Sequence, residues 1–421
     1  MSCGWKDVDV QNYPGRVVVD LEAIASNVRT LDAGTTAQVM AVVKADAYGH
    51  GLVPASRAAR AGGAAWLGAA QVSEALALRA AGDTGRILTW LYAPGAPLRE
   101  AVEADIDVAI AAPWNVAALV DAARTAGRTA RVQIKVDTGL GRNGVTPGQL
   151  PEVLDAAMRA QAEGAIAVVG VFSHFAFADA PAHPTVLAQA EEFARAVEAV
   201  ERAGARIEVR HLANSAATVT NPGVHYDLVR PGIAVYGLSP VPELSSSAEL
   251  GLVPAMTFES ELAAVKPLPA GHGISYAHQY TTTEDTVMGL VPLGYADGVP
   301  RHCSGTGGQL GAPVRVGGRD LAIAGRVCMD QLVVDLGPGA QETEGERVEL
   351  FGTGGGGGPT AQDWADAAGT ISYEIVTRIG TRVPRSYLPV ATPSSPEKRA
   401  VPREASAVLA EAGTPVAEPR P

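Results

Sequence analysis

A lysine stands at the end of an apolar run early in this 421-residue sequence, within AVVKADAYGHG (41–51). An amine placed there is partly removed from water, which lowers its pKa and lets it form a Schiff base with a carbonyl compound. For Lys44 alone, a side chain that merely extends from the protein rim to solvent is the simpler alternative. Polar residues and two glycines that follow later apolar runs make a reactive lysine the better interpretation. They are Asp137, Gly141, Arg142, His174, Asn214, Ser215, Arg230 and Gly232.

Two of these later segments have the composition of a phosphate-binding site. In HLANSAAT (211–218), Asn214 and Ser215 stand where a short helix would begin, so backbone N–H groups and a hydroxyl could face an anion. In VRPGIAVYG (229–237), Gly232 would let the backbone approach that anion closely. A carbonyl-capturing lysine opposite a phosphate site predicts pyridoxal 5'-phosphate as the cofactor.

The elements that would position these residues are short β-rich runs alternating with alanine-rich helical stretches. The runs are almost continuously apolar, which is typical of parallel strands buried on both faces. They span 38–45, 64–70, 86–93, 106–112, 131–137, 166–174, 206–213 and 226–237. Eight strand–helix alternations predict an α/β fold, a (β/α)8 TIM-type barrel whose strands end at one shared mouth. A doubly wound open sheet has the same local pattern and is the alternative.

The sequence changes character after Pro240. Segments such as TVMGLVPLGY and ERVELFG alternate around glycine-rich turns with almost no helical periodicity, which predicts a mainly antiparallel β domain. From Thr392 onward Pro, Ala and Glu dominate, which predicts a disordered tail. The predicted divisions are an N-terminal segment (1–13), the barrel (14–244), the β domain (245–389) and the tail (390–421).

Charge and composition exclude several classes of partner. The chain has 45 Asp plus Glu against 33 Lys plus Arg, a net charge of -12, so it lacks the positive field that binds nucleic acid or an anionic membrane. No segment approaches the roughly 18 apolar residues of a transmembrane helix, and MSCGWKDVDV does not resemble a signal peptide. Cys3, Cys303 and Cys328 are too few and scattered for disulfides or a metal site. We expect a cytoplasmic protein with small-molecule partners.

Eight short strings closely resemble, in order, those of bacterial alanine racemase, a family of fold-type III pyridoxal-phosphate enzymes. They are AVVKADAYGHG, KVDTGLGRNG, HLANSA, VRPGIAVYG, GISYAHQY, GYADG, GRVCMD and TISYEI, all within residues 14–389. One string would be weak support, but eight in the same order make a chance match very unlikely. The resemblance implies interconversion of L-alanine and D-alanine, a supply of D-alanine for peptidoglycan synthesis, and a homodimer with shared active sites.

The resemblance also implies residue roles at the cofactor. Lys44 would hold the cofactor covalently and exchange the Cα proton on one face, while Tyr276 of the partner subunit would be the base on the other. Residues of the phosphate site would be Tyr48, Asn214, Ser215, Gly232, Ile233 and Tyr373. Around the ring would be Arg230 at the pyridine nitrogen, His211 beside it, Arg142 at the phenolic oxygen and His174 near the catalytic tyrosine. Trp90 is equally a candidate for the ring face and for core packing.

Further roles concern the substrate and its entrance. Met329 and Asp330 resemble residues that one subunit sends to the substrate carboxylate in the other, where Arg142 would also bind, and Tyr295 resembles a gate tyrosine. Lys135 matches a lysine that is carbamylated in some members, where it orients the residue matching Arg142. Taken singly, Tyr276 would be an ordinary cross-strand aromatic residue, and Tyr295 and Tyr373 would more simply be structural.

The implied roles agree with the chemistry. Racemisation removes a proton from one face of Cα and returns one to the other, so two bases must flank that carbon. An arginine does not readily give up a proton, so Arg230 would leave the pyridine nitrogen unprotonated and disfavour transamination. Three alternatives fit part of the pattern: a decarboxylase of basic amino acids, whose expected GP-x-CD-like segment is absent from the sequence, a racemase of broader specificity, and a non-catalytic cofactor carrier with a barrel only.

Overall fold

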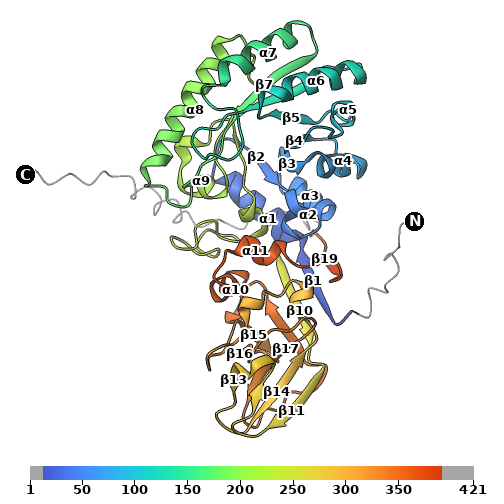
Figure 1. The fold of residues 1–421 in the computed structure, drawn as a ribbon, viewed down its shortest axis with the longest axis vertical. Coiled ribbons are helices and arrows are strands. Elements are labelled where there is room, and N and C mark those ends of the chain that lie inside the picture. Colours follow the sequence, from blue (N-terminus) through green and yellow to red (C-terminus); the bar gives the residue numbers. More distant parts are fainter. Residues whose placement is uncertain (1–12, 391–421) are drawn as a thin grey trace, which may run out of the picture.

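A computed structural model describes residues 13–390 and has two parts, a barrel of strands and helices and an elongated β domain beneath it (Figure 1). Residues 1–12 and 391–421 lie outside the described residues, and with them the predicted N-terminal segment, apart from Tyr13, and the predicted tail, apart from Val390.

Eight parallel strands form the barrel, in the order β8-β7-β6-β5-β4-β3-β2-β9. They are β2 (Gln38–Val42), β3 (Trp66–Gln71), β4 (Arg86–Leu91), β5 (Asp107–Ile110), β6 (Ala130–Lys135), β7 (Ile166–Phe172), β8 (Val209–His211) and β9 (Leu228–Val229). A parallel bridge between Asn214 and Arg230 joins the two ends of this order, beyond β8 and β9. Each strand overlaps a predicted run, and the barrel prediction is confirmed.

Helices cover the outside of the barrel (Figure 1). They are α1 (Leu21–Ala33), α3 (Leu52–Ala61), α4 (Val72–Ala80), α5 (Leu98–Glu103), α6 (Pro113–Ala126), α7 (Leu150–Ala162), α8 (Pro184–Arg202) and α9 (Ser215–Thr220), with short 3-10 turns η2 (Pro222–Val224) and η3 (Ile233–Tyr236). The longest, α8, begins with a proline at its first position, where no N–H is needed, and His183 accepts a hydrogen bond from Thr185 N. Phe193, Val197 and Val200 are buried at helical spacing, so one face of α8 packs on the barrel.

The β domain contains a six-stranded sheet (β16-β15-β18-β10-β1-β19), a three-stranded sheet (β11-β14-β17) and the pair β12-β13. The strands after the barrel are β10 (Met256–Glu261), β11 (Ala264–Leu268), β12 (Gly273–Ile274), β13 (Tyr280–Thr281), β14 (Thr286–Val291), β15 (Pro313–Val316), β16 (Arg319–Ala322), β17 (Leu332–Gly337), β18 (Arg347–Phe351) and β19 (Arg385–Leu388). The 3-10 turns are η4 (Tyr276–His278), η5 (Tyr295–Asp297), η6 (Arg301–Cys303) and η7 (Gly355–Gly357). Within these sheets only β1 and β19 pair in parallel, so the mainly antiparallel domain is confirmed.

The first strand, β1 (Gly15–Asp20), corrects the predicted barrel boundary at residue 14. It pairs antiparallel with β10 and parallel with β19, so it belongs to the β domain's large sheet. Val17 and Val19 are fully buried while Arg16 is exposed, which is the one-sided alternation of an antiparallel sheet and not the two-sided burial of a barrel strand.

Two helices, α10 (Ala361–Ala368) and α11 (Ser372–Thr377), lie at the junction of the two parts (Figure 1). The sequence pattern predicted almost no helix here. At eight and six residues the helices are too short to repeat an apolar pattern. Local signals hold them instead: Thr360 and Asp363 form a capping box at the start of α10, and Trp364 is completely buried.

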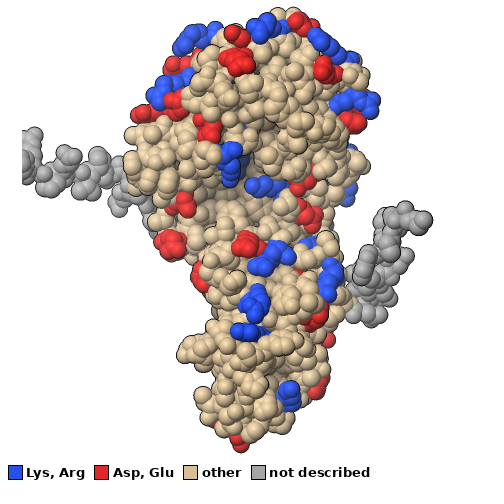
Figure 2. All heavy atoms as spheres, in the orientation of Figure 1, with Lys and Arg blue, Asp and Glu red and all other residues tan. Residues whose placement is uncertain are grey.

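The molecular surface carries both signs of charge. On the face shown in Figure 2, Lys and Arg are interspersed with Asp and Glu, and large areas carry neither. Among residues 13–390, no helix is both long and apolar enough to cross a bilayer, and no three His, Cys, Asp or Glu side chains are grouped to hold a metal ion.

Candidate active site

A cavity of about 140 Å³ lies at the carboxyl ends of the barrel strands. Predicted site residues that line it are Lys44, Tyr48, Trp90, Lys135, Arg142, His174, Asn214, Ser215, Arg230, Gly232 and Tyr373, and Val42 and Phe172 complete the wall. Two lysines and two arginines are among these lining residues, and no Asp or Glu is. A cavity with four cationic side chains favours an anionic ligand.

The turn that carries Lys44 is strained. In α2 (Lys44–Tyr48), the four residues after the lysine all have φ between 54° and 56°, the left-handed region that costs a non-glycine residue about 1–2 kcal/mol each. Glu74 holds the turn, because its carboxylate accepts hydrogen bonds from Ala45 N at 2.7 Å and from Ala70 N and Gln71 N in the α4 cap. Strain that is over-determined in this way is common at functional sites.

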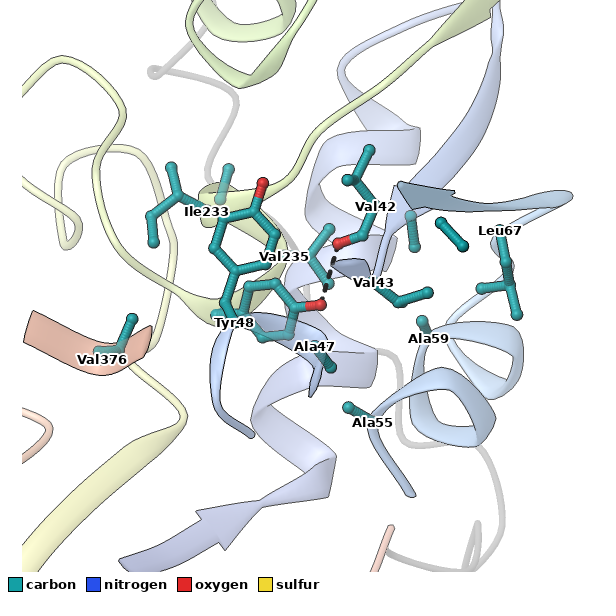
Figure 3. Close-up of a cluster of buried hydrophobic side chains, with 14 of the residues drawn as sticks. Val42, Val43, Ala47, Tyr48, Ala55, Ala59, Leu67, Ile233, Val235 and Val376 are labelled. Carbon is teal, nitrogen blue, oxygen red and sulfur yellow. Dashed lines mark hydrogen bonds between the residues drawn. The ribbon is translucent and has the colours of Figure 1, made fainter. Parts of the chain in front are cut away.

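The same turn is locked against α11. Gly49 has a φ of 81°, and a Cβ added there would lie 2.3 Å from Val376 O, so only glycine allows this close approach. Arg385 Nε also donates to Gly49 O at 2.8 Å. In Figure 3, Tyr48 shares one buried cluster with Ile233 of η3 and Val376 of α11. The lysine turn is thus fixed by both parts of the molecule.

Two lysine amines in the cavity are made less basic by their surroundings. Burial lowers the pKa of Lys44 below its usual 10.5, the charges of Arg142 and Arg230 lower it further, and Glu74 opposes them. Burial also lowers the pKa of Lys135 to about 8, and Arg230, Arg142 and Lys44 add to this effect. Both amines therefore reach the neutral, nucleophilic form more easily than a lysine in water does.

Opposite Lys44 the structure forms a cradle from the loops after β8 and β9. Asn214 caps α9 by accepting from Ala217 N at 3.1 Å, as the sequence predicted for a helix start. Ser215 Oγ lies 2.7 Å from Gly232 N. A Cβ at position 232 would lie 2.2 Å from Tyr48 Oη, so any side chain larger than hydrogen would fill this space. The hydroxyls of Ser215 and Tyr48 and the surrounding positive charge suit a phosphate group.

Arg230 lines the floor of the cavity, and its two terminal nitrogens make several hydrogen bonds. It donates to Ser173 O at 2.6 Å, Leu212 O at 3.2 Å and His211 Nδ1 at 3.0 Å. His174 Nδ1 lies 3.4 Å from the same guanidinium. Burial and the cluster of positive charges hold the pKa of His174 well below 6.5, so its ring is neutral and can accept from Arg230.

The loop that presents Arg142 is organised by one carboxylate. Asp137 Oδ1 accepts from Gly139 N at 3.0 Å and Gly141 N at 3.1 Å, and Oδ2 accepts from Arg142 N at 3.2 Å. Lys135, at the end of β6, lines the cavity together with Arg142.

Six predicted site residues do not line the cavity. Two of them, His211 and Ile233, are completely buried in the core. The other four, Tyr276, Tyr295, Met329 and Asp330, belong to the β domain.

Three motifs of the β domain meet at one surface patch, defined here as Tyr276, Tyr295, Met329 and Asp330. Tyr295 N donates to Cys328 O at 3.0 Å, and the next residue, Ala296, donates to Met329 O at 2.9 Å. Ser275, beside Tyr276, donates to Arg326 O at 2.8 Å. The side chains remain uncovered: Tyr276 is 69% exposed, Met329 54% and Tyr295 40%.

Sequence reasoning missed some functional positions. Val42 and Phe172 were assigned only to strands, although both line the cavity. Glu74 received no role because it lies on a helix away from every motif. Only the hydrogen bond that it accepts from Ala45 N in the folded chain shows that it supports the lysine turn. Gln133 and Asp107 were likewise unassigned, and a polar residue inside the apolar run RVQIKVD was the available signal.

Fold and cavity together define the class: a (β/α)8 barrel whose mouth holds a lysine and a Ser215–Gly232 cradle in one cavity, followed by a β domain. Comparison with known proteins identifies the family. Residues 19–240 match the model of the alanine racemase N-terminal domain, and residues 255–387 match that of the alanine racemase C-terminal domain. The chain belongs to the alanine racemase family, whose members depend on pyridoxal phosphate.

Individual relatives agree with this assignment. The chain is 58% identical to the alanine racemase of Beutenbergia cavernae over 377 residues, covering 89% of this chain and 98% of the relative. Among solved structures, the alanine racemase from D-cycloserine-producing Streptomyces lavendulae has a TM-score of 0.87 and 54% identity, covering 89% of this chain and 97% of that one. The Streptomyces coelicolor alanine racemase has the same TM-score and identity, covering 91% and 100%.

Proposed function

We propose that this chain interconverts L-alanine and D-alanine with pyridoxal 5'-phosphate bound in the barrel cavity, and that it supplies D-alanine for peptidoglycan synthesis. The observation that carries the proposal is that Lys44, whose pKa is lowered, lies in the same cavity as the Ser215–Gly232 cradle. No carboxylate lines that cavity. Family membership provides the reaction, and the cavity provides a fitting site for the cofactor.

The cofactor fits the residues that are present. Ser215, Gly232, Tyr48 and Tyr373 would hold its phosphate, and Lys44 would hold its aldehyde carbon. Arg230 would face the ring nitrogen, with Trp90 and His174 beside the ring. When bound, pyridoxal phosphate withdraws electrons from the amino acid and so acidifies its Cα–H bond.

The chain's own side chains would then handle the proton. Lys44 Nζ, whose pKa is lowered by burial and by Arg142, takes the proton from one face of Cα or returns it there. Arg230 keeps its own proton: burial lowers its pKa only to about 9, still above neutrality. Arg230 would therefore leave the ring nitrogen of a bound cofactor unprotonated, which would limit side reactions.

The second base would come from another copy of the chain. Tyr276 is 69% exposed and is absent from the wall of the cavity that contains Lys44, so within one chain it does not line the site of Lys44. We assign that base to Tyr276 of a partner subunit, in a homodimer whose sites are shared. Met329, Asp330 and Tyr295 lie in the same patch and would reach the substrate and its entrance in the same way.

Lys135 would carry a carbamate. Its amine has a pKa of about 8 and lies among three other cations, so conversion to an anionic carbamate by carbon dioxide would relieve their repulsion. The product would be a hydrogen-bond acceptor able to orient Arg142.

A direct test is turnover by the purified chain with pyridoxal phosphate. We expect D-alanine to form from L-alanine until the two are equal, measured by chiral chromatography. Serine should be slower, because Tyr276, Tyr295 and Met329 of a partner subunit would leave little room beyond a methyl group. Lysine and arginine should release no carbon dioxide. Decarboxylation, or cofactor binding without any racemisation, would contradict the proposal.

We also place the enzyme in the cytoplasm, where the reaction's amino-acid substrate is available.

A further inference from the structure

A line of buried, hydrogen-bonded side chains runs through the barrel from the cavity toward the opposite end of the strands. Arg230 Nη1 lies 3.0 Å from His211 Nδ1, and His211 Nε2 lies 2.7 Å from Gln133 Oε1. Gln133 Nε2 donates to Asp107 Oδ2 at 2.9 Å, and Arg131 Nε donates to Asp107 Oδ1 at 2.8 Å. His211, Gln133 and Asp107 are all completely buried. Polar groups in an apolar core are costly unless paired, and every link of this line is paired.

A glycine makes the line possible. Gln133 is in β6 and His211 is in β8, with β7 between them. Gln133 is the cross-strand partner of Gly170 in β7. A Cβ at position 170 would lie 3.0 Å from Gln133 Oε1, closer than side chains normally pack. The absence of a side chain at Gly170 therefore leaves the path by which Gln133 crosses to His211.

Donor and acceptor rules fix the protons along the line. A guanidinium only donates, so His211 Nδ1 must accept from Arg230. A neutral imidazole that accepts at Nδ1 carries its proton on Nε2, which then donates to Gln133 Oε1. The amide must therefore turn its NH2 group toward Asp107, whose carboxylate accepts it. Burial and the charge of Arg230 hold the pKa of His211 well below 6.5, in agreement with a neutral ring.

We propose that Asp107 and Gln133 are positioning residues that hold His211 in the Nε2-protonated tautomer and through it fix Arg230 at the cavity floor. If the Gln133 amide turned over, its NH2 group would face Nε2 and the histidine proton would move to Nδ1. That proton would then oppose the N–H of Arg230, donor against donor, and the guanidinium would lose its His211 contact. The aligned Asp107 carboxylate prevents this turn, because it accepts only from the NH2 side.

The test is the tautomer of His211 in the ¹⁵N-histidine-labelled holoenzyme, observed by long-range ¹H–¹⁵N NMR and assigned from its loss in His211→Gln. We expect a protonated Nε2 and a bare Nδ1 in the wild type. Asp107→Asn and Gln133→Met should each introduce a second tautomer. Glu208→Gln is the matched control, because Glu208 also pairs with Arg131, at 2.7 Å, yet does not contact Gln133. It should leave the histidine spectrum unchanged.

A second readout connects the tautomer to the reaction and rests on the proposed racemase activity. In Asp107→Asn we expect kcat to fall about tenfold with KM nearly unchanged, the size of one lost buried hydrogen bond, and no change in Glu208→Gln. A wild-type His211 protonated on Nδ1 or on both nitrogens would overturn the proposal even if the variants fail to fold. A changed tautomer with unchanged kcat would overturn the link to Arg230. A wild type that shows the expected tautomer without racemising alanine would instead reject the proposed function alone.

Discussion

Two strained turns carry the two residues to which we assign proton transfer. Both turns have backbone in the left-handed region, but their contacts and their exposure to solvent differ. Seven of the nine non-glycine residues with positive φ in the described part of the chain flank Lys44 or Tyr276. Both ends of the Lys44 turn are held by hydrogen bonds, from Ala45 N to Glu74 and from Arg385 to Gly49 O, and Lys44 lines a cavity. Around Tyr276 the base of the turn is anchored through Ser275, but the ring projects into solvent.

The difference shows what each turn lacks. Backbone strain persists only where surrounding contacts over-determine it, and the Lys44 turn satisfies this condition within one chain. The Tyr276 turn presents an uncovered aromatic ring in the same patch as exposed Met329, and exposed apolar side chains gathered in this way are typical of an interaction surface. The Lys44 turn is complete within one chain, and in our proposal the Tyr276 turn is completed by a second copy of the chain.

The largest loss of activity is expected from removing Lys44. Lys44→Ala should reduce racemisation by at least about 10⁴-fold, because it removes both the covalent attachment and one base. Borohydride reduction of the wild-type holoenzyme, followed by peptide mapping, should place the pyridoxyl adduct on Lys44. Lys266→Ala, at an exposed position of β11, is the control and should retain full activity. An adduct on Lys135 would refute the assignment.

A smaller loss is expected from the exposed half. Tyr276→Phe should slow both directions of racemisation by about 10²–10⁴-fold, the usual contribution of one acid–base group. Exchange of the Cα proton with deuterated solvent should survive for the enantiomer whose proton faces Lys44, which family resemblance identifies as D-alanine. Tyr226→Phe, which removes a hydroxyl beside Arg210, away from both turns, is the control. Equal exchange of both enantiomers at the wild-type rate would exclude a two-base mechanism.

A change in the contacts of the Lys44 turn sharpens the comparison further. Glu74→Gln should lower the free energy of unfolding by about 1–2 kcal/mol, because a charged acceptor of three backbone N–H groups becomes neutral. Since Glu74 raises the pKa of Lys44, its loss should lower that pKa and shift the reactivity of the amine toward lower pH. Urea denaturation and the pH dependence of cofactor attachment to the apoprotein measure the two effects. Glu198→Gln, an exposed helix pair with Arg202, should change neither; equal shifts in both variants would contradict the role of Glu74.

The smallest effect concerns Lys135. Only its neutral amine reacts with carbon dioxide, so carbamate formation should rise as pH increases through about 8. A ¹³C-bicarbonate NMR signal should follow this rise and be absent in Lys135→Ala, with activity changing only severalfold on removal of bicarbonate. A signal that persists in Lys135→Ala would assign the carbamate elsewhere.

The sequence predicted the barrel well because its strands are buried on both faces and the longer helices between them, such as α7 and α8, have an amphipathic pattern. It misplaced β1, since a valine run before a helix has the same appearance in either domain until its partner strand is known. It missed α10 and α11 because short helices depend on caps and on buried Trp364 more than on periodicity.

The candidate site was predicted unevenly for a similar reason. Residues at strand ends, such as Lys44 and Ser215, could be found because a barrel brings all such ends to one mouth. The left-handed turn after Lys44 could not, since Ala45, Asp46 and Ala47 are residues that ordinarily avoid positive φ. The line from Arg230 to Asp107 depends on Gly170 leaving space between strands, which only the paired register reveals.

The central claim is that the Lys44 half and the Tyr276 half of one site come from different chains. Mixing inactive Lys44→Ala and Tyr276→Phe proteins, with subunit exchange followed by native mass spectrometry, tests it directly. Half of randomly paired dimers would be mixed, and each would contain one intact site, so about a quarter of wild-type activity should return. If mixed dimers form and no activity returns, both bases act within one chain and the account is wrong.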